Sequence, residues 1–325
     1  MSKYFVTGAA GFIAAKVCEL LLRDGHTVVG MDNLNDAYDI RLKLWRLERL
    51  NAQKGFTFHQ ADIRDLSGLK AVFEANKSFD GVINLAARAG VRYSVENPWE
   101  YLETNSNGTL NLLEMARHYQ VPKFILASTS SIYGANAPLP TPEEADSDHP
   151  LQPYSASKKA AEALCHSYHF LHDLDVTIFR YFTVYGPAGR PDMVMFRFAQ
   201  WIAEGKTVRL NGDGEQTRGF TYVDDIARGT ILGLKPLGYE VINLGGHEVI
   251  SINEMTRILE TLIGRKANVE RYPAHKADML SNWANVSKAK RLLGWAPQVG
   301  LEEGIGRMVD WYMQERDWAS QVLTP

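Results

Sequence analysis

The chain has 325 residues, enough to build one large hydrophobic core or two modest ones. Its formal net charge of −3 at pH 7 lacks the basic footprint of proteins that bind nucleic acids or membrane surfaces. No apolar stretch is long enough to span a bilayer, and the first predicted strand begins almost at Met1, which leaves no room for a signal peptide, so we expect a cytoplasmic protein.

The first predicted elements are a strand, a glycine turn and a helix. Tyr4–Val6 is apolar, Gly8 and Gly11 permit a tight turn, and apolar residues then recur at helical spacing from Phe12 to Leu22. This order is typical of a dinucleotide-binding fold, in which backbone N–H groups at the helix N-terminus face the pyrophosphate. A purely structural βα turn is the alternative, because a lone glycine pattern is weak.

The second predicted strand favours the dinucleotide interpretation. It runs from His26 to Met31 and ends in Asp32, whose carboxylate would accept hydrogen bonds from the adenosine ribose. A carboxylate at this position repels a 2′-phosphate, so NAD is favoured over NADP.

Further apolar strands alternate with amphipathic helices along the first part of the chain. The strands are predicted at Phe56–Ala61, Gly81–Ala86, Lys123–Thr129 and Val176–Phe182. Such alternation predicts an α/β protein with a Rossmann-type, doubly wound parallel sheet. We expect residues 1–181 to form an NAD-binding domain.

After about residue 181 the pattern loosens, which suits a smaller C-terminal α/β substrate domain over residues 182–325. Its predicted elements are strands at Thr207–Leu210 and Val269–Tyr272 and helices at Met195–Glu204, Asn253–Leu262 and Glu302–Tyr312. The two domains are expected to be interleaved, because Phe220–Asp225 and Val241–Gly246 look like returns to the large sheet.

The strand at Lys123–Thr129 leads into a run of hydroxyl side chains. Ser128, Thr129, Ser130 and Ser131 arrive at its carboxyl end, where open α/β sheets bind ligands. A serine-rich loop that caps a helix is the alternative interpretation.

Tyr154 and Lys158 form a candidate proton-transfer pair. Ser155 to His169 reads as a helix, so two residues four apart lie on one face of it. A nearby ammonium is expected to lower the pKa of the phenol from about 10 towards working pH, as a general acid–base requires. An exposed helical pair is the alternative, because this spacing often occurs by chance.

The remaining ionisable groups suggest no metal centre. Cys18 and Cys165 both fall in predicted helices, and two cysteines in a long chain indicate reduced, packed thiols. No His/Cys cluster has metal-ligand spacing.

Taken together, these residues resemble the extended short-chain dehydrogenase/reductase family of NAD-dependent sugar-nucleotide epimerases and dehydratases. The resemblance covers nearly the whole chain. Three stretches resemble the subgroup that epimerises UDP-glucuronate at C4, and the last two are specific to it: 32–39 (DNLNDAYD), 85–98 (LAARAGVRYSVENP) and 182–193 (FTVYGPAGRPDM).

The resemblance implies a mechanism and a cofactor site. Tyr154 would act as the base on the sugar 4-hydroxyl while NAD⁺ takes the hydride from C4, Lys158 would hold the nicotinamide ribose, and Thr129 would hydrogen-bond the same oxygen as Tyr154. The 4-keto sugar then rotates and is reduced on its other face, so NAD stays bound. The cofactor-binding residues implied are Gly8, Gly11, Phe12, Ile13, Asp32, Asn33, Asp62, Ile63, Leu85, Ala86, Ala87, Asn105, Tyr154, Lys158 and Tyr181.

The resemblance also implies a substrate site. A 4-keto uronic acid loses CO₂ easily unless its carboxylate is held, and in the family hydroxyl groups hold it. Related decarboxylases carry glutamate at the position of Ser131, and dehydratases carry Asp-Glu at Ser130-Ser131, so both reactions are disfavoured here. The substrate-binding residues implied are Arg88, Thr129, Ser130, Ser131, Thr183, Arg190, Arg218 and Asp278.

Several alternatives stay open from the sequence. A UDP-glucose or UDP-N-acetylglucosamine 4-epimerase uses the same machinery, and His275, where some hexose epimerases carry arginine, weakens that alternative slightly. A UDP-glucuronate decarboxylase, a dehydrogenase and a non-enzymatic NAD-binding regulator are the others. By resemblance, the helices Leu102–His118 and Ser155–Phe170 would form a four-helix homodimer interface, whereas their apolar faces could equally cover the sheet.

Overall fold

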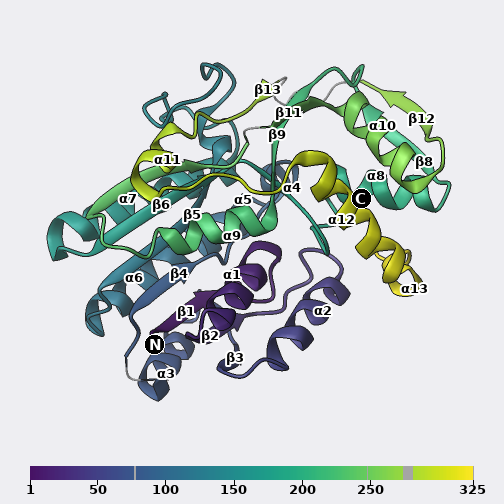
Figure 1. The fold of residues 1–325 in the computed structure, drawn as a ribbon. Coiled ribbons are helices and arrows are strands. Elements are labelled where there is room, and N and C mark those ends of the chain that lie inside the picture. The colour runs from purple at the N-terminus through teal and green to yellow at the C-terminus, as the bar shows by residue number, and fades with distance from the viewer. Residues whose placement is uncertain (77, 247, 274–280, 325) are drawn as a thin grey trace.

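A seven-stranded parallel sheet forms the centre of the first part of the molecule (Figure 1). The computed structural model describes residues 1–76, 78–246, 248–273 and 281–324. Across the sheet the order is β3-β2-β1-β4-β5-β6-β10. The chain adds strands towards one edge from β1 to β3 and towards the other edge from β4 onwards, so the order of the strands reverses between β1 and β4. The strands are β1 (Lys3–Thr7), β2 (Thr27–Asp32), β3 (Phe56–Gln60), β4 (Gly81–Asn84), β5 (Lys123–Thr129), β6 (Asp175–Tyr181) and β10 (Tyr239–Leu244).

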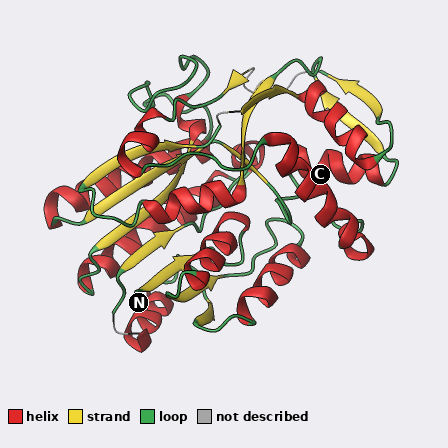
Figure 2. Cartoon of the chain, in the orientation of Figure 1, coloured by secondary structure: helices red, strands yellow, loops and turns green. Residues whose placement is uncertain are grey.

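Helices cover both faces of this sheet (Figure 2), as its apolar strands require. Successive side chains of a strand point to opposite faces, so Tyr4 and Val6 of β1 enter one core while Phe5 enters the other. The first core includes α1 (Phe12–Arg23), α9 (Val223–Leu232) and α11 (Ser287–Leu293). The second includes α3 (Leu66–Asn76), α6 (Gly108–His118) and α7 (Pro153–His172).

A second, smaller part has its own core and lies at the end of the molecule that carries the C-terminus (Figure 1). A small sheet of β7 (Thr183–Tyr185), β9 (Thr217–Tyr222), β11 (Glu248–Ser251) and β13 (Ser281–Asn282) connects it to the large one. A strand pair follows, β8 (Thr207–Asn211) with β12 (Asn268–Tyr272). The helices here are α8 (Val194–Ala203), α10 (Ile252–Ile263), α12 (Leu301–Gln314) and α13 (Arg316–Ala319).

The predicted fold class is confirmed, and one predicted strand pairing is wrong. The stretch Val241–Gly246 does return to the large sheet, because β10 pairs in parallel with β6. The stretch Phe220–Asp225 does not: β9 pairs with β7 and β11 in the small sheet, and α9 then carries the chain back to pack against α1. An apolar strand buries its side chains in either sheet, so its sequence does not reveal which sheet it joins.

Helix α2 (Ile40–Asn51) packs on α1 and β3 of the first part and also on the second part. Its Leu42 is fully buried in a cluster with Phe196 of α8 and Trp311 and Tyr312 of α12. The indole of Trp45 meets that of Trp311 edge-on at 5.7 Å. The two parts of the molecule are therefore joined by this helix as well as by the chain crossings.

The helices suggested for a dimer interface both cover the sheet. Leu112, Leu113 and Ala116 of α6 and Ala161 and Cys165 of α7 are buried in the second core. Cys18 and Cys165 are buried free thiols in helices, as expected. Within the described residues, no helix combines the length and the apolar character that crossing a membrane demands.

Removing the Leu42 side chain should loosen the junction between the two parts. We expect Leu42→Ala to lower the free energy of unfolding by about 2–5 kcal/mol, because a fully buried leucine leaves a cavity. Leu44→Ala on the same helix is the control, since Leu44 is 46% exposed. Urea unfolding measures both variants, and equal losses would contradict the role given to Leu42.

Candidate active site at the carboxyl edge of the parallel sheet

The glycine turn after β1 lies directly against the segment after β4. Gly8 has a φ of +69°, and a Cβ there would lie 2.9 Å from the backbone N and Cα of Ala86. The amide of Gly11 donates to the carbonyl of Gly8 at 2.7 Å, and Gly11 begins α1 with no side-chain cap. The backbone amides in the first turn of α1 have no side-chain cap, and Gly8 leaves no room for a Cβ. Both features fit the binding of a dinucleotide pyrophosphate.

Buried hydrogen bonds fix the far wall of this crevice. Thr7 Oγ1 donates to Asn84 Oδ1 at 2.8 Å and accepts from the amide of Ala86 at 3.2 Å. Asn84 Nδ2 in turn donates to Thr109 Oγ1 at 3.0 Å. Leu85, Ala86 and Ala87 are thereby held at the point between β1 and β4 where open α/β sheets bind ligands.

Asp32 ends β2 beside a lysine that the sequence interpretation missed. The Asp32 carboxylate accepts from the amide of Leu34 at 2.8 Å and lies 3.7 Å from Lys43 Nζ. Burial lowers the pKa of Lys43, and the nearby Asp32 opposes that shift. No signal in the sequence marks Lys43, because its burial depends on what packs against α2.

The next strand end lies beside Asp32. Asn33 Nδ2 donates to Asp62 Oδ2 at 2.8 Å, and Arg64 also binds that carboxylate. These bonds hold the pKa of Asp62 below its usual value against the opposing effect of burial. Ile63 is buried next to them, so the expected adenosine-side residues do come together.

Asn105 and Tyr181, which the resemblance implies bind the cofactor, both make hydrogen bonds within the protein. The Asn105 amide accepts from the backbone N–H of Arg88 at 2.8 Å and donates to the Arg88 carbonyl at 3.0 Å and to Ser157 Oγ at 2.9 Å. Both amide hydrogens are therefore used within the protein, and Asn105 positions other residues. It lies in a π-helical turn, Leu102–Asn107. The hydroxyl of Tyr181 is bonded to Thr230 of α9 at 2.7 Å.

Tyr154 lies among a hydroxyl, a cation and a buried aromatic ring. Burial raises the pKa of Tyr154, and the lowering influences come from a hydrogen bond with Thr129 and the charge of Arg190. Within the chain itself burial outweighs these two groups, and the lowering of this pKa by Lys158 stays a prediction. The ring of fully buried Tyr101 meets Tyr154 edge-on at 6.1 Å.

Lys158 is buried on the same helix, four residues after Tyr154, as expected. Burial lowers the pKa of its ammonium to about 8, and the carboxylate of Glu162 opposes that shift. Glu162 itself accepts from Ser128 Oγ at 2.5 Å and pairs with Arg180 at 2.8 Å. The carboxylate of Glu162 therefore acts on Lys158 and also belongs to a hydrogen-bond network that joins α7 to β5 and β6.

The hydroxyl cluster follows β5 as a short 3₁₀ turn, Ser130–Tyr133. Thr129 Oγ1 accepts from the amide of Ser131 at 3.1 Å, and Ser130 Oγ accepts from Asn282 of β13 at 3.0 Å. Thr183 begins β7, which pairs with β9, the strand that carries Arg218. The cluster thus meets the second part of the molecule at β13. Asp278 and His275 lie outside the described residues.

The charge of Arg88 lies near Tyr101, as do Arg190 and Tyr154. Its Nε lies 3.2 Å from Glu100 Oε2, and its guanidinium lies over the ring of Tyr93. Arg88 is 9% exposed, and its buried Nη1 has no hydrogen-bond partner among the described residues. Such an atom fits a polar ligand group, because a buried donor without a partner is costly. Arg190 instead binds Asp192 Oδ1 through Nε at 3.0 Å.

Comparison with known proteins gives the family. The model of the NAD dependent epimerase/dehydratase family matches residues 4–245. The chain belongs to this family. It is 56% identical over 312 residues to the UDP-glucuronate 4-epimerase of Thermodesulfobacterium geofontis, covering 96% of each chain.

Solved structures of family members agree in fold over nearly the whole chain. One is the UDP-glucuronic acid 4-epimerase of Bacillus cereus in complex with UDP-glucuronic acid and NAD, with TM-score 0.89, 37% identity and coverage of 96% and 99% of the two chains. Another is the UDP-glucose 4-epimerase of Thermotoga maritima with UDP-glucose, with TM-score 0.89, 32% identity and coverage of 97% and 99%. The cofactor of this family is NAD, as the glycine turn and Asp32 led us to expect.

Adding one methyl group at the glycine turn should weaken NAD binding. We expect Gly8→Ala to raise the dissociation constant for NAD at least about tenfold, or roughly 1.4 kcal/mol, because its Cβ would push the turn away from Ala86. Gly25→Ala is the control, since Gly25 has a φ of +83° but no atom near its added Cβ. Fluorescence titration with NAD compares the variants, and wild-type affinity in Gly8→Ala would show that the contact is unimportant.

Proposed function

We propose that this protein is a UDP-glucuronate 4-epimerase that interconverts UDP-glucuronate and UDP-galacturonate. The observation that carries the proposal is the surroundings of Tyr154: the hydroxyl of Thr129 and the charge of Arg190 both act on its phenol. A hydroxyl cluster without a carboxylate, Thr129–Ser131, continues from the same strand. The 56% identity to an enzyme of this name supports the choice of substrate.

In the proposed reaction the phenolate of Tyr154 takes the proton of the sugar 4-hydroxyl and later returns it. Bound NAD⁺ supplies the hydride acceptor at C4 and, once reduced, the hydride donor. Thr129 donates a hydrogen bond that stabilises the phenolate, because hydrogen bonding to a charged form favours that form. Lys158 holds the nicotinamide ribose, and the carboxylate of Glu162 favours its protonated form.

The carboxylate of the substrate must be held while C4 is a ketone. We propose that Ser130, Ser131 and Thr183 donate hydrogen bonds to it and that Arg190 pairs with its charge. Arg190 is suited to this, since its charge already reaches Tyr154 and it is only 26% exposed. Its Nε and Nη2 both bind the carboxylate of Asp192, so Asp192 fixes the guanidinium and Arg190 would act on the substrate through its charge. The unpartnered Nη1 of Arg88 is a further donor at this site.

The rest of the substrate is assigned to the second part of the molecule. We propose that Arg218 binds the diphosphate and that Asp278 binds the uridine ribose. In this scheme residues 1–181 hold NAD and contribute the hydroxyl cluster and Arg88 to the sugar, and residues 182–325 hold the rest of the sugar nucleotide, although β10 and α9 of that range pack with the first part. Arg218 lies on β9, in register with Asn282, which donates to Ser130. The diphosphate and the sugar carboxylate would thus lie at adjacent strands.

We also propose a cytoplasmic homodimer. Several apolar side chains stay exposed near α6 and α7, such as Trp99 at 73% and Phe170 at 77%. A surface of this kind would be buried if α6 and α7 paired with the same helices of a second copy. Sedimentation velocity of the purified protein tests the assembly, and a monomer at micromolar concentration would contradict it.

Proton NMR of the purified protein with UDP-glucuronate tests the proposed function. We expect the anomeric signal of UDP-galacturonate to grow to a stable mixture with UDP-glucuronate. If the protein converts UDP-glucose and does not convert UDP-glucuronate, its substrate is a neutral hexose. Release of CO₂ with a pentose product would show a decarboxylase, and stoichiometric free NADH a dehydrogenase. Each of these three outcomes would overturn the proposal.

Replacing the phenol should remove turnover and leave binding intact. We expect Tyr154→Phe to lower kcat about 10²–10⁴-fold, the usual contribution of a general acid–base. NAD content and the dissociation constant for UDP-glucuronate should be unchanged, because the ring stays. Tyr168→Phe, on the same helix but bonded to Glu114, is the control. Near-normal kcat in Tyr154→Phe would exclude this tyrosine as the base.

A negative charge in the hydroxyl cluster should release the substrate carboxylate. We expect Ser131→Glu to raise the ratio of pentose to epimer product, because a carboxylate repels that of the substrate. Ser131→Gln has the same size without the charge and should raise the ratio less. NMR of the product mixture measures both ratios. An unchanged ratio in Ser131→Glu would contradict the holding role of the cluster.

A further inference from the structure

The second helix of the chain connects the cofactor side to the substrate side. Helix α2 follows Asp32 and the loop after it, and its Lys43 contacts both Asp32 and Asn35. The opposite side of α2 packs on α12 and α13 through Leu42 and Trp45. This helix is therefore placed to transmit a change between the two binding regions.

Arg46, in the middle of this helix, makes the connection through hydrogen bonds. Its Nη1 donates to the carbonyl of Ala10 at 2.8 Å, and its Nη2 donates to the carbonyl of Ala188 at 2.6 Å. Nε donates to the same Ala188 carbonyl at 3.2 Å, and Nη1 also reaches the hydroxyl of Tyr38 at 2.9 Å. The residue is 4% exposed.

The two backbone carbonyls belong to the two ligand-binding segments. Ala10 lies inside the glycine turn, between Gly8 and Gly11. Ala188 lies two residues before Arg190, in the segment proposed to hold the substrate, and has a φ of +51°. One guanidinium thus fixes the distance between the cofactor turn and the segment that carries Arg190.

Among the residues that the structure describes, no carboxylate forms an ion pair with Arg46 that would explain the burial of its charge. The hydrogen-bond acceptors recorded for Arg46 are all neutral oxygens, and burying a charge among neutral groups is costly. A lysine could not replace it, because an ammonium is a single point on a flexible stem whereas a guanidinium is a rigid fork. The geometry therefore indicates a role that needs both carbonyls bound at once.

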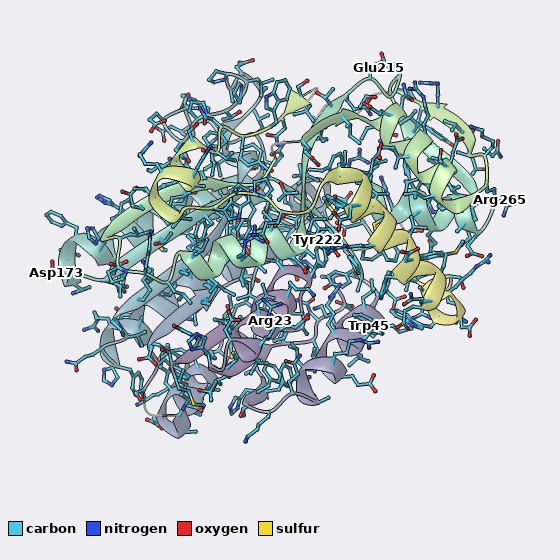
Figure 3. The ribbon with its side chains drawn as sticks, viewed as in Figure 1. Arg23, Trp45, Asp173, Glu215, Tyr222 and Arg265 are labelled. Carbon is cyan, nitrogen blue, oxygen red and sulfur yellow. The ribbon has the colours of Figure 1, made fainter. Side chains whose placement is uncertain are left out.

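A cleft lies beside Arg46, whose guanidinium also lies against the rings of Phe12 and Tyr38. This cleft of about 290 Å³ borders Arg46, Phe12 and Ala188. Trp45 of α2 and Tyr222, just before α9, also line it, and both are labelled in Figure 3. Arg46 itself is buried, so its hydrogen bonds to the two carbonyls are shielded from solvent.

We propose that Arg46 is a positioning residue that couples NAD binding at the glycine turn to UDP-sugar binding at the segment carrying Arg190. A ligand that orders either segment orders the other through the shared guanidinium. The second ligand to bind then loses less conformational entropy, so each ligand slows the release of the other. The inference rests on the proposed function in that it needs a UDP-containing ligand, but not on which sugar that ligand carries.

The test measures NAD release with and without UDP. In wild-type protein loaded with labelled NAD, saturating UDP should slow NAD release by about tenfold, within the usual range of coupling between sites. In Arg46→Met the ratio of the NAD release rates without and with UDP should fall close to one, because the hydrophobic side chain binds neither carbonyl. Arg46→Lys should recover part of the effect, since it can bind one carbonyl at a time.

Arg49→Met is the matched control. Arg49 lies one turn further along α2, stacks on Trp45 and pairs with Glu315, so it also joins α2 to the second part but touches neither ligand segment. It should keep the wild-type effect of UDP. Melting temperatures of the variants show whether folding is intact, and if Arg46→Met does not fold, Arg46→Lys gives the result.

Three results would overturn the proposal: wild-type NAD release insensitive to UDP, an Arg46 variant that folds and keeps the full effect, or equal loss in Arg49→Met. None of them bears on the sugar. Because UDP lacks the uronic acid, a wrong substrate assignment would show only in the NMR assay of the wild-type protein. The two proposals can therefore fail separately.

Discussion

The close contact between the turn after β1 and the segment after β4 organises the whole site. It exists because Gly8 has no side chain: a Cβ would lie 2.9 Å from backbone atoms of Ala86. From there hydrogen bonds lead to the catalytic helix. Asn105 binds both backbone groups of Arg88 and the hydroxyl of Ser157, and Ser157 in turn donates to the carbonyl of Tyr154 at 2.7 Å. The position of Tyr154 therefore depends on the cofactor crevice.

Burial of charge sets the electrostatics of this site. Glu162 and Arg180 form a buried pair with two hydrogen bonds, and Ser128 binds the same carboxylate. Removing one partner of such a pair is strongly destabilising, because the other charge stays buried alone. Ser128 directly precedes Thr129, and the Glu162 carboxylate opposes the lowering of the Lys158 pKa by burial, so this buried network supports both residues.

The molecule is divided into two parts by its cores, but α2 and α9 join them. Leu42 and Trp45 bury themselves against α12 and α13, while Arg46 and Lys43 on the same helix reach the cofactor side. An active site between two parts requires that they keep their relative position as ligands bind. Helix α2 contacts both parts and so helps to fix their relative position.

The sequence by itself determined the elements and the residue types of the site. Local periodicity and glycine spacing were sufficient for β1, α1 and the parallel sheet, and for Tyr154 and Lys158 on one helix, because these depend on neighbours in the chain. Only the tertiary structure decided which sheet β9 joins, that Asn105 binds the backbone of Arg88, and that burial raises the pKa of Tyr154. It also revealed Lys43 and Arg46. Their contacts depend on residues far apart in sequence, and desolvation depends on everything packed around a group.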